Sequence, residues 1–399
     1  MSEDAAISYA TPFAGLKVLD FSQGYAGPTC AMLLGLQGAA VTKVEPAKGD
    51  WARGLGPAYG DHTALDIAAN VGKRGLALDL KHPDGLAVAL KLAEQADVFI
   101  ESFRPGVAER LGLGYEALSA LNPRLLYLSV SGFGHVGPYA ERPCTDTVAQ
   151  SFSGITDANR GADGVPAKVP FVVVDAVSGL YAFQALSSAL YARRALDHGR
   201  HIDVNLVASA AALQSYRIAD YALEGAVVDT LNAPAGVYRT ADGWITVTLV
   251  TEAQYQALCR TIDRPDLAND PDYADFKRRA ARKASLMAEI QAALQTADTE
   301  TWLSRLAEAD VLADRINNYA DWLAHPHTVA VDGAPELSQP GVGTVRLPAV
   351  PGLGRSMRDA ATPAPAIGQH SADILAEAGY TPEQIDALAS AGAVMIATA

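Results

Sequence analysis

One aspartate, Asp175, stands where a carboxylate could act as a nucleophile. It lies between the apolar run 169–174 and the helix-like stretch 176–196, a pattern that predicts the end of a buried strand followed by a helix. The N–H groups of the first helical turn and the positive end of the helix macrodipole would favour an ionised carboxylate. Such a carboxylate could attack an acyl group and carry it covalently. The alternative is that Asp175 only caps the helix, and the local sequence by itself favours that role.

Other residues that could bind a ligand lie in the loops after strand-like segments. Glycine-rich or polar loops occupy residues 22–27, 102–106 and 131–134. Basic residues lie in or near such connections: Lys73, Arg74, Arg104, Arg110 and Arg142. Glycine-rich turns, helix N-termini and arginine side chains all suit phosphate oxygens, so together these loops could hold a phosphate-bearing ligand. Taken singly, each basic residue is more often a solvated surface charge.

The elements that must position these loops alternate along the first third of the chain. Strands are predicted at 16–21, 39–44, 76–80, 98–101 and 125–130, with helices at 28–37, 83–95 and 115–121. This alternation predicts an α/β fold, a Rossmann-like parallel sheet wrapped by helices, with ligands beyond the carboxyl ends of the strands. A dinucleotide site is the alternative for the first turn. However, GYAGPT at 24–29 lacks the GxGxxG spacing, and Pro28 has no N–H for a pyrophosphate.

Composition excludes several classes of partner. The chain has 399 residues and a formal charge of −14, which argues against nucleic acid and against anionic membranes because both require a basic face. No run approaches the roughly 18 apolar residues of a membrane span, and the N-terminus lacks the order of a signal peptide. We therefore expect a cytoplasmic protein. Cys30, Cys144 and Cys259 have no metal-ligand spacing, so neither a metal site nor a disulfide framework is expected.

Several long blocks in a fixed order resemble the class III CoA-transferase family, which contains the formyl-CoA:oxalate and carnitine CoA-transferases. The blocks are LKVLDFSQGYAGPTCAMLLGLQGAAVTKVEP (16–46), GKRGLALDLKHPDG (72–85), ADVFIESFRPGVAERLGLGYEAL (96–118), NPRLLYLSVSGFGHVGPYAERP (122–143) and DAVSGLYAFQALSSALYARRALDHGRHIDVNL (175–206). The resemblance covers nearly the whole chain, and no single block carries it alone.

The resemblance implies a mechanism in which Asp175 is the catalytic nucleophile. Its carboxylate would attack the donor acyl-CoA to form a mixed anhydride, and the released CoA thiolate would then form an aspartyl-CoA thioester. The acceptor acid would repeat the sequence in reverse. Coenzyme A enters as a co-substrate thioester, and the partners are acyl-CoA and small carboxylate substrates. By analogy with related enzymes, we expect a donor such as succinyl-CoA and a small, dicarboxylic acceptor.

The family's fold implies an interlocked homodimer whose subunits each have a large and a small domain. In this chain, residues 1–224 would form the first part of a Rossmann-like large domain, and 225–330 a smaller α+β domain. Residues 331–399 would form a linker and a return to the large domain. The family's coenzyme A contacts map onto Gly24, Tyr25, Lys73, Arg74, Leu78, Leu80, Ser102, Phe103, Arg104 and Arg110.

Departures from the family pattern limit the choice of substrate and of reaction. Tyr25 and Pro46 stand where formyl-CoA transferases have a glutamine and an arginine, which disfavours oxalate. The alternative reaction is racemisation of 2-methylacyl-CoA esters by α-proton transfer. Relatives that racemise use a histidine after SGFG, but this chain has Thr145 there, and His135 is out of register. Without a paired acid and base, transfer is the favoured reaction.

Overall fold

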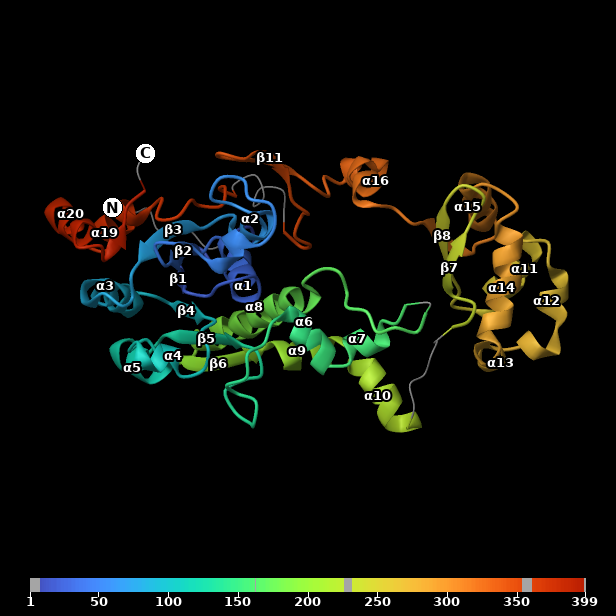
Figure 1. Cartoon of the computed structure of the whole chain (residues 1–399), viewed down its shortest axis with the longest axis horizontal. Coiled ribbons are helices and arrows are strands. Elements are labelled where there is room, and N and C mark those ends of the chain that lie inside the picture. The colour runs from blue at the N-terminus through green and yellow to red at the C-terminus, as the bar shows by residue number, and fades with distance from the viewer. Residues whose placement is uncertain (1–7, 162, 226–231, 354–360, 398–399) are drawn as a thin grey trace. The chain divides into compact units, whose positions relative to one another are not determined.

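The structure is a computed structural model that describes residues 8–161, 163–225, 232–353 and 361–397. The chain divides into two compact units (Figure 1). The large unit comprises Met1–Ser215 and Asp332–Ala399, and the small unit comprises Tyr216–Val331. The large unit is therefore discontinuous in sequence.

A seven-stranded sheet with the order β12-β3-β2-β1-β4-β5-β6 is the centre of the large unit. Its strands are β1 (Lys17–Asp20), β2 (Ala40–Glu45), β3 (Arg74–Leu78), β4 (Val98–Glu101), β5 (Leu126–Ser131), β6 (Arg200–Asn205) and β12 (Val394–Met395). Strands β1 to β6 are all parallel to their neighbours, whereas β12 pairs with β3 in the antiparallel direction. The predicted α/β class and its parallel sheet are thus confirmed.

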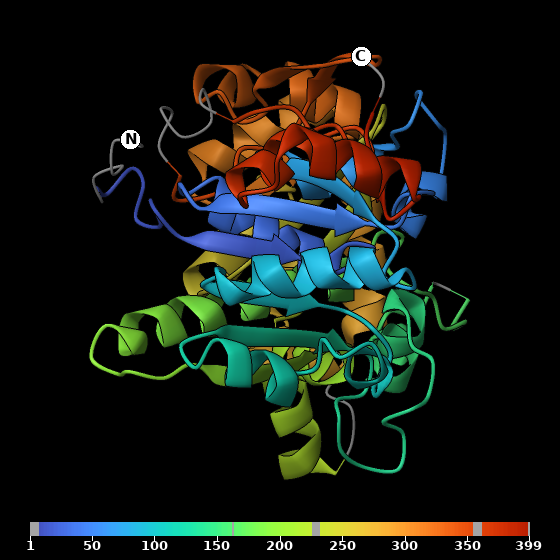
Figure 2. The ribbon, with the colours of Figure 1, turned by 90° about the vertical axis from the view of Figure 1, so that its left-hand side faces the viewer.

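Alternating residues of each buried strand serve two separate cores, one on each face of the sheet. Val98 and Ile100 of β4 belong to the core beneath α1 (Ala26–Gly35) and α8 (Val173–Arg193), while Phe99 belongs to the opposite core. This two-residue period follows from the geometry of a strand. Helices α3 (Pro83–Glu94), α5 (Tyr115–Leu121), α19 (Ser371–Glu377) and α20 (Pro382–Ser390) cover the second face. In Figure 2 the red α19 and α20 and the cyan α3 lie in front of the blue strands.

Shorter elements complete the large unit. They are η1 (Trp51–Gly54), α2 (Ala64–Asn70), α4 (Val107–Arg110), α6 (Asp146–Phe152), α7 (Ile155–Ala158), α9 (Leu206–Leu213) and the antiparallel pair β10 (Glu336–Gln339) and β11 (Gly343–Arg346). Helix α10 (Ser215–Glu224) begins at the unit boundary. Among the described residues, α8 alone has the length and hydropathy of a membrane span, and it packs against the sheet core.

The small unit has its own sheet and core. Strands β7 (Gly236–Arg239), β8 (Trp244–Thr248) and β9 (Leu312–Arg315) form an antiparallel sheet in that order. Ile245 and Val247 of β8 pack with Leu258, Leu286 and Trp302 of the surrounding helices. The helices are α11 (Glu252–Thr261), α12 (Pro265–Asn269), η2 (Pro271–Tyr273), α13 (Phe276–Ala281), α14 (Lys283–Leu294), α15 (Thr299–Glu308), α16 (Tyr319–Ala324) and α17 (Pro326–Ala330).

The start of α8 differs from the sequence prediction. Residues 169–172 form no strand, and the helix already begins at Val173, so Asp175 lies inside its first turn. Pro170 has no N–H to offer a strand ladder. The N–H groups of Val174 and Asp175 donate instead to a side chain of α6. The predicted buried strand before Asp175 is therefore wrong.

Candidate active site

A cavity of about 350 Å³ opens at the carboxyl ends of β1, β4 and β5. Its wall comes from the loop after β1, the loop after β4, the end of β5, the segment 140–146 and the first turn of α8. Parallel strands leave their following loops at one edge of the sheet, so segments distant in sequence meet there. The carboxylate-bearing Asp175 lines this cavity.

Asp146, and not Asp175, caps the start of α8. The buried Asp146 carboxylate accepts hydrogen bonds from the N–H of Val174 (2.7 Å) and the N–H of Asp175 (3.1 Å). Its other oxygen accepts from Gln150 Nε2 at 2.5 Å. The capping role considered for Asp175 is therefore wrong, and two of the first-turn N–H groups expected to point at its carboxylate are already used. Within the described part of the chain, the Asp175 side chain has neither an ion pair nor a hydrogen bond at normal distances.

The environment of Asp175 makes its carboxyl less acidic than the sequence suggests. Burial, and then the negative charge of Asp146, raise the pKa of Asp175 to about 7. Desolvation disfavours the charged form, and a like charge adds to the effect. About half of the molecules would therefore carry an ionised Asp175 near neutral pH. The ionised form can act as a carboxylate nucleophile. A carboxylate is also a weak enough base to leave again when the acyl group is passed on.

Cys144 also lines the cavity, which the sequence did not indicate. Burial, and then the charge of Asp175, raise the pKa of the Cys144 thiol to about 11. A thiol must ionise to act as a nucleophile. At neutral pH Cys144 therefore does not compete with Asp175. Cys30 and Cys259 are buried, as expected for small apolar residues.

The predicted coenzyme A residues fall into two groups. Tyr25, Ser102, Phe103 and Arg104 line the cavity, and Gly24 lies in the same loop as Tyr25. The remaining residues do not line it: Lys73, Arg74, Leu78, Leu80 and Arg110. For both groups, contact with coenzyme A stays a prediction.

Two basic residues of the second group already have protein partners. Lys73 is buried, and its ammonium group donates to Asp20 Oδ2 (2.7 Å), to Asn70 Oδ1 (2.9 Å) and to a backbone carbonyl. Arg74 is partly exposed and pairs with Glu377 at 2.7 Å. The sequence gives both residues the appearance of loop cations, because their charged partners lie 53 and 303 residues away.

Two further residues of the cavity wall are absent from the predicted coenzyme A contacts, and only Trp51 was missed by the sequence analysis altogether. Trp51 of η1 lines it, and so does Arg142, whose guanidinium group lies over the rings of Phe133 and Tyr139 at 5.5 Å and 4.9 Å from their centroids. Arg142 was visible as a loop cation. Trp51 gave no signal, because nothing in the sequence indicates which loop it packs against.

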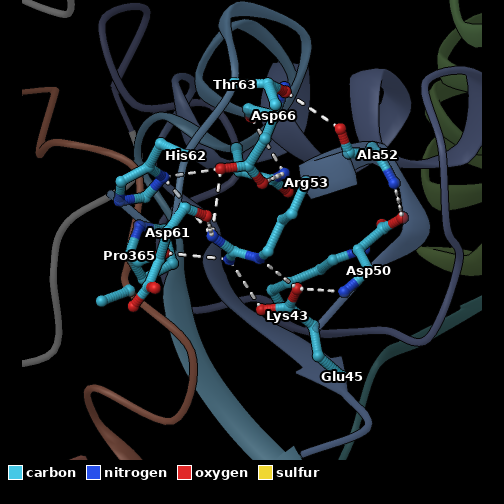
Figure 3. Close-up of polar contacts among 12 residues, drawn as sticks. Lys43, Glu45, Asp50, Ala52, Arg53, Asp61, His62, Thr63, Asp66 and Pro365 are labelled. Carbon is cyan, nitrogen blue, oxygen red and sulfur yellow. Dashed lines mark hydrogen bonds and ion pairs between the residues drawn. The ribbon is translucent and has the colours of Figure 1, made fainter. Parts of the chain in front are cut away.

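A buried network of charged side chains surrounds Arg53 of η1 (Figure 3). Arg53 pairs with Glu45 at 2.8 Å and with Asp66 at 3.1 Å, and Asp66 also contacts His62 at 2.6 Å. Arg53 Nη2 reaches the carbonyl of Pro365 at 3.1 Å. The network thus joins the end of β2, η1, α2 and the C-terminal segment, and every charge in it has a partner, as burial requires.

Among the residues that the structure describes, no histidine lines the cavity. His135 instead pairs with Asp203 at 3.2 Å. The racemase alternative, which needs a paired acid and base at the α-carbon, gains no support from this arrangement. Among the described residues, no group of His, Cys, Asp and Glu side chains could hold a metal ion.

A free carboxylate in a cavity at the carboxyl ends of a parallel sheet suits an enzyme that transfers acyl groups. The model of the family described as CoA-transferase family III matches residues 13–371, and the chain belongs to that family. This confirms the resemblance found in the sequence.

Individual relatives agree with the family assignment. The chain is 31% identical to the succinyl-CoA:glutarate CoA-transferase of Homo sapiens, over 96% of this chain and 90% of that protein. It is 34% identical to the acetyl-CoA:oxalate CoA-transferase of Acetobacter aceti, over 83% of this chain and 87% of that protein. The crystal structure of a CaiB/BaiF family protein from Brucella suis superposes with a TM-score of 0.80 at 32% identity, over 92% of this chain and all (100%) of that chain.

Proposed function

We propose that this CoA-transferase moves coenzyme A from an acyl-CoA donor to a dicarboxylic acid, with Asp175 as the covalent nucleophile. The observation that carries the proposal is the Asp175 carboxylate, unpaired within the described chain, in the wall of a cavity that a substrate can enter. The family assignment limits the chemistry to CoA thioesters. The human relative is named for succinyl-CoA and glutarate, which supports dicarboxylic acids on both sides of the reaction.

The first half-reaction proceeds in two steps. The Asp175 carboxylate attacks the thioester carbonyl of the donor, and the carbon–sulfur bond breaks to release the CoA thiolate and leave a mixed anhydride. The thiolate then attacks the aspartyl carbonyl, which releases the donor as a free carboxylate and leaves an aspartyl-CoA thioester. Once Asp175 is ionised, no external base is required, because each nucleophile is then an anion.

The second half-reaction reverses these steps with a different acid. The acceptor carboxylate attacks the aspartyl thioester and displaces the CoA thiolate. The thiolate then attacks the acceptor's carbonyl, which forms the new acyl-CoA and returns the Asp175 carboxylate. Both intermediates hydrolyse if water reaches them, so a closed site is an advantage.

Arg104 and Phe103, in the loop after β4, are our candidates for holding coenzyme A at the cavity wall. A guanidinium group can bind phosphate oxygens through two hydrogen bonds, and an aromatic ring can lie against the adenine or the pantetheine arm. We also propose that the chain forms a homodimer, with domains at 1–224 and 225–330 and a return through 331–399. The division of the chain near residues 215 and 331 supports two domains, and light scattering would measure the oligomer.

The proposal is tested by trapping the intermediate. Wild-type protein is incubated with succinyl-CoA without an acceptor, and its peptides are weighed. We expect the peptide containing Asp175 to gain the mass of coenzyme A less that of a water molecule. Asp175→Ala should show no adduct and lose transfer by several orders of magnitude.

Asp197→Ala is the matched control, because this aspartate lies just beyond α8 and its side chain is fully exposed. It should form the adduct and transfer coenzyme A as the wild type does. Near-normal transfer in Asp175→Ala, or an adduct on another peptide, would show that the nucleophile is a different residue.

A further inference from the structure

Asp50 is a buried carboxylate next to the cavity, outside the residues assigned to the reaction so far. Its side chain is inaccessible to solvent and pairs with Lys43 Nζ at 2.8 Å. It also accepts hydrogen bonds from two backbone N–H groups, those of Gly24 (3.0 Å) and Ala52 (2.9 Å). Gly24 belongs to the loop after β1 and Ala52 to η1, and both segments contribute to the cavity wall. The Asp50 carboxylate therefore connects these two segments.

The loop after β1 and η1 also meet directly at Gly24 and Trp51. Gly24 has a φ of +85°, and a Cβ added there would lie 2.3 Å from Cζ2 of the Trp51 indole. The glycine therefore allows both the backbone conformation and the close approach of the indole ring. Gln23 and Tyr25, the neighbours of Gly24, line the cavity together with Trp51.

A second side chain holds the loop from the opposite side. The N–H of Gln23 donates to the hydroxyl of Ser102 at 2.8 Å, and Ser102 follows β4. The loop is thus fixed at two consecutive amides, one by Ser102 and one by Asp50. Ser102 belongs to the cavity wall itself, whereas Asp50 does not line this cavity. Asp50 lies instead in the wall of an adjacent hollow that shares Gln23 and Trp51 with the cavity. Because its side chain is fully buried, we expect it to act on a ligand in the cavity through the loop and Trp51.

We propose that Asp50 is a positioning residue for coenzyme A, which sets the Gln23–Tyr25 loop and Trp51 in the conformation that binds the thioester. This inference rests on the proposed function for the identity of the ligand. The position of the Asp50 oxygens governs the binding of coenzyme A, whereas the charge of Asp50 governs mainly the stability of the protein. A loop already held in place binds its ligand without first having to be ordered.

Two substitutions at the same site separate position from charge. Asp50→Asn keeps the oxygen that accepts from Gly24 and Ala52 but places an amide group opposite Lys43. Asp50→Glu keeps the charge for Lys43 but moves the carboxylate away from both backbone donors by one methylene. Purified proteins are titrated with coenzyme A itself by calorimetry, and the KM for succinyl-CoA is measured in parallel.

We expect Asp50→Glu to raise the Kd for coenzyme A and the KM for succinyl-CoA about tenfold, equivalent to about 1.4 kcal/mol. The kcat should change by less than about threefold, since Asp175 is untouched. In Asp50→Asn the Kd should stay within about threefold of wild type, while its thermal midpoint falls because Lys43 loses its anionic partner. The reverse order, with Asp50→Asn binding coenzyme A more weakly than Asp50→Glu, would overturn the proposal.

Asp66→Asn is the control for general loss of stability. Asp66 is a buried carboxylate that pairs with Arg53 and does not line the cavity. It belongs to the network around Arg53, to which Asp50 is joined because the N–H of Asp50 donates to Glu45 Oε1 at 2.9 Å. Asp66→Asn should lower the thermal midpoint and leave the Kd for coenzyme A unchanged. An equal rise in Kd in Asp66→Asn and Asp50→Glu would mean that any damage to the network weakens binding, and the positioning role would be rejected.

The calorimetric readout also separates this inference from the proposed function. If wild-type protein binds coenzyme A but transfers none, the proposed function fails, and the comparison of the Asp50 variants still decides the positioning role. If transfer occurs and the Kd is insensitive to Asp50→Glu, only the positioning role fails.

Discussion

The pKa of Asp175 gives the sharpest test of the mechanism, because the nucleophile must be ionised. With a pKa of about 7, only about a tenth of the molecules carry the carboxylate one pH unit lower, and about nine tenths carry it one unit higher. The rate of enzyme–CoA adduct formation should therefore fall about tenfold for each pH unit below about 6 and level off above about 8.

Removing the charge of Asp146 should move this profile in a known direction. Asp146 is the second cause of the raised pKa, after burial. Asp146→Asn retains an oxygen for the N–H groups of Val174 and Asp175 and removes the like charge. We expect the midpoint to fall by on the order of one pH unit, the scale of a partly screened pair of charges. It should stay above the unperturbed value of about 3.9, because burial is unchanged.

The assay is rapid mixing of enzyme with succinyl-CoA, followed by acid quenching and mass measurement of the adduct between about pH 5 and about pH 9. Circular dichroism at each pH checks that the protein stays folded. Asp197→Asn, which removes an exposed charge, should keep the wild-type midpoint. A flat profile over this range, or a midpoint that rises in Asp146→Asn, would refute the account of how Asp175 is tuned.

Three further outcomes are expected. Asp175→Asn should raise the thermal midpoint at about pH 8 but not at about pH 4. Because the pKa of Asp175 is higher in the folded protein than in the unfolded chain, the folded protein loses stability as the pH rises through about 7, and a neutral amide removes this loss. Arg53→Ala should lower the free energy of unfolding by about 3–5 kcal/mol in urea titrations, because two buried carboxylates lose their partner. Gly24→Ala should weaken coenzyme A binding by clashing with Trp51, whereas Gly15→Ala, at a similar φ of +83° with no atom within 4 Å, should bind normally.

The sequence predicts the interior of the large unit better than its margins. Strands β1, β2, β4 and β5 lie within about a residue of their predicted positions, because they are buried and rich in apolar residues. Even β2, which buries Lys43 and Glu45, keeps apolar residues at Val41 and Val44. Strand β6, with the sequence RHIDVN, alternates polar and apolar residues at the sheet edge and was not predicted. Strand β12 has only two residues, too few for any periodic signal.

The sequence places Asp175 in the site, where the structure also has it, but it does not indicate the residues that hold it. The role of Asp175 as the nucleophile stays a prediction. Asp175 was identified from its local setting and from the family resemblance. The contacts of Asp146 with the amide of Asp175 and of Asp50 with the amide of Gly24 span 29 and 26 residues. Pairings of this kind depend on how loops meet at the sheet edge, and no local pattern in a single sequence encodes them.

The route of the chain through the large unit affects the order of events during synthesis. Residues of α19, α20 and β12 complete the core that contains Leu76, Leu78 and Phe99, on the second face of the large sheet. These three elements emerge from the ribosome only after the whole of 216–331. That intervening unit is continuous in sequence and has its own core, so it can complete its fold first. Until α19, α20 and β12 have been synthesised, Leu76, Leu78 and Phe99 lie on a sheet face that is incompletely covered. A growing chain with exposed apolar surface of this kind is prone to aggregation.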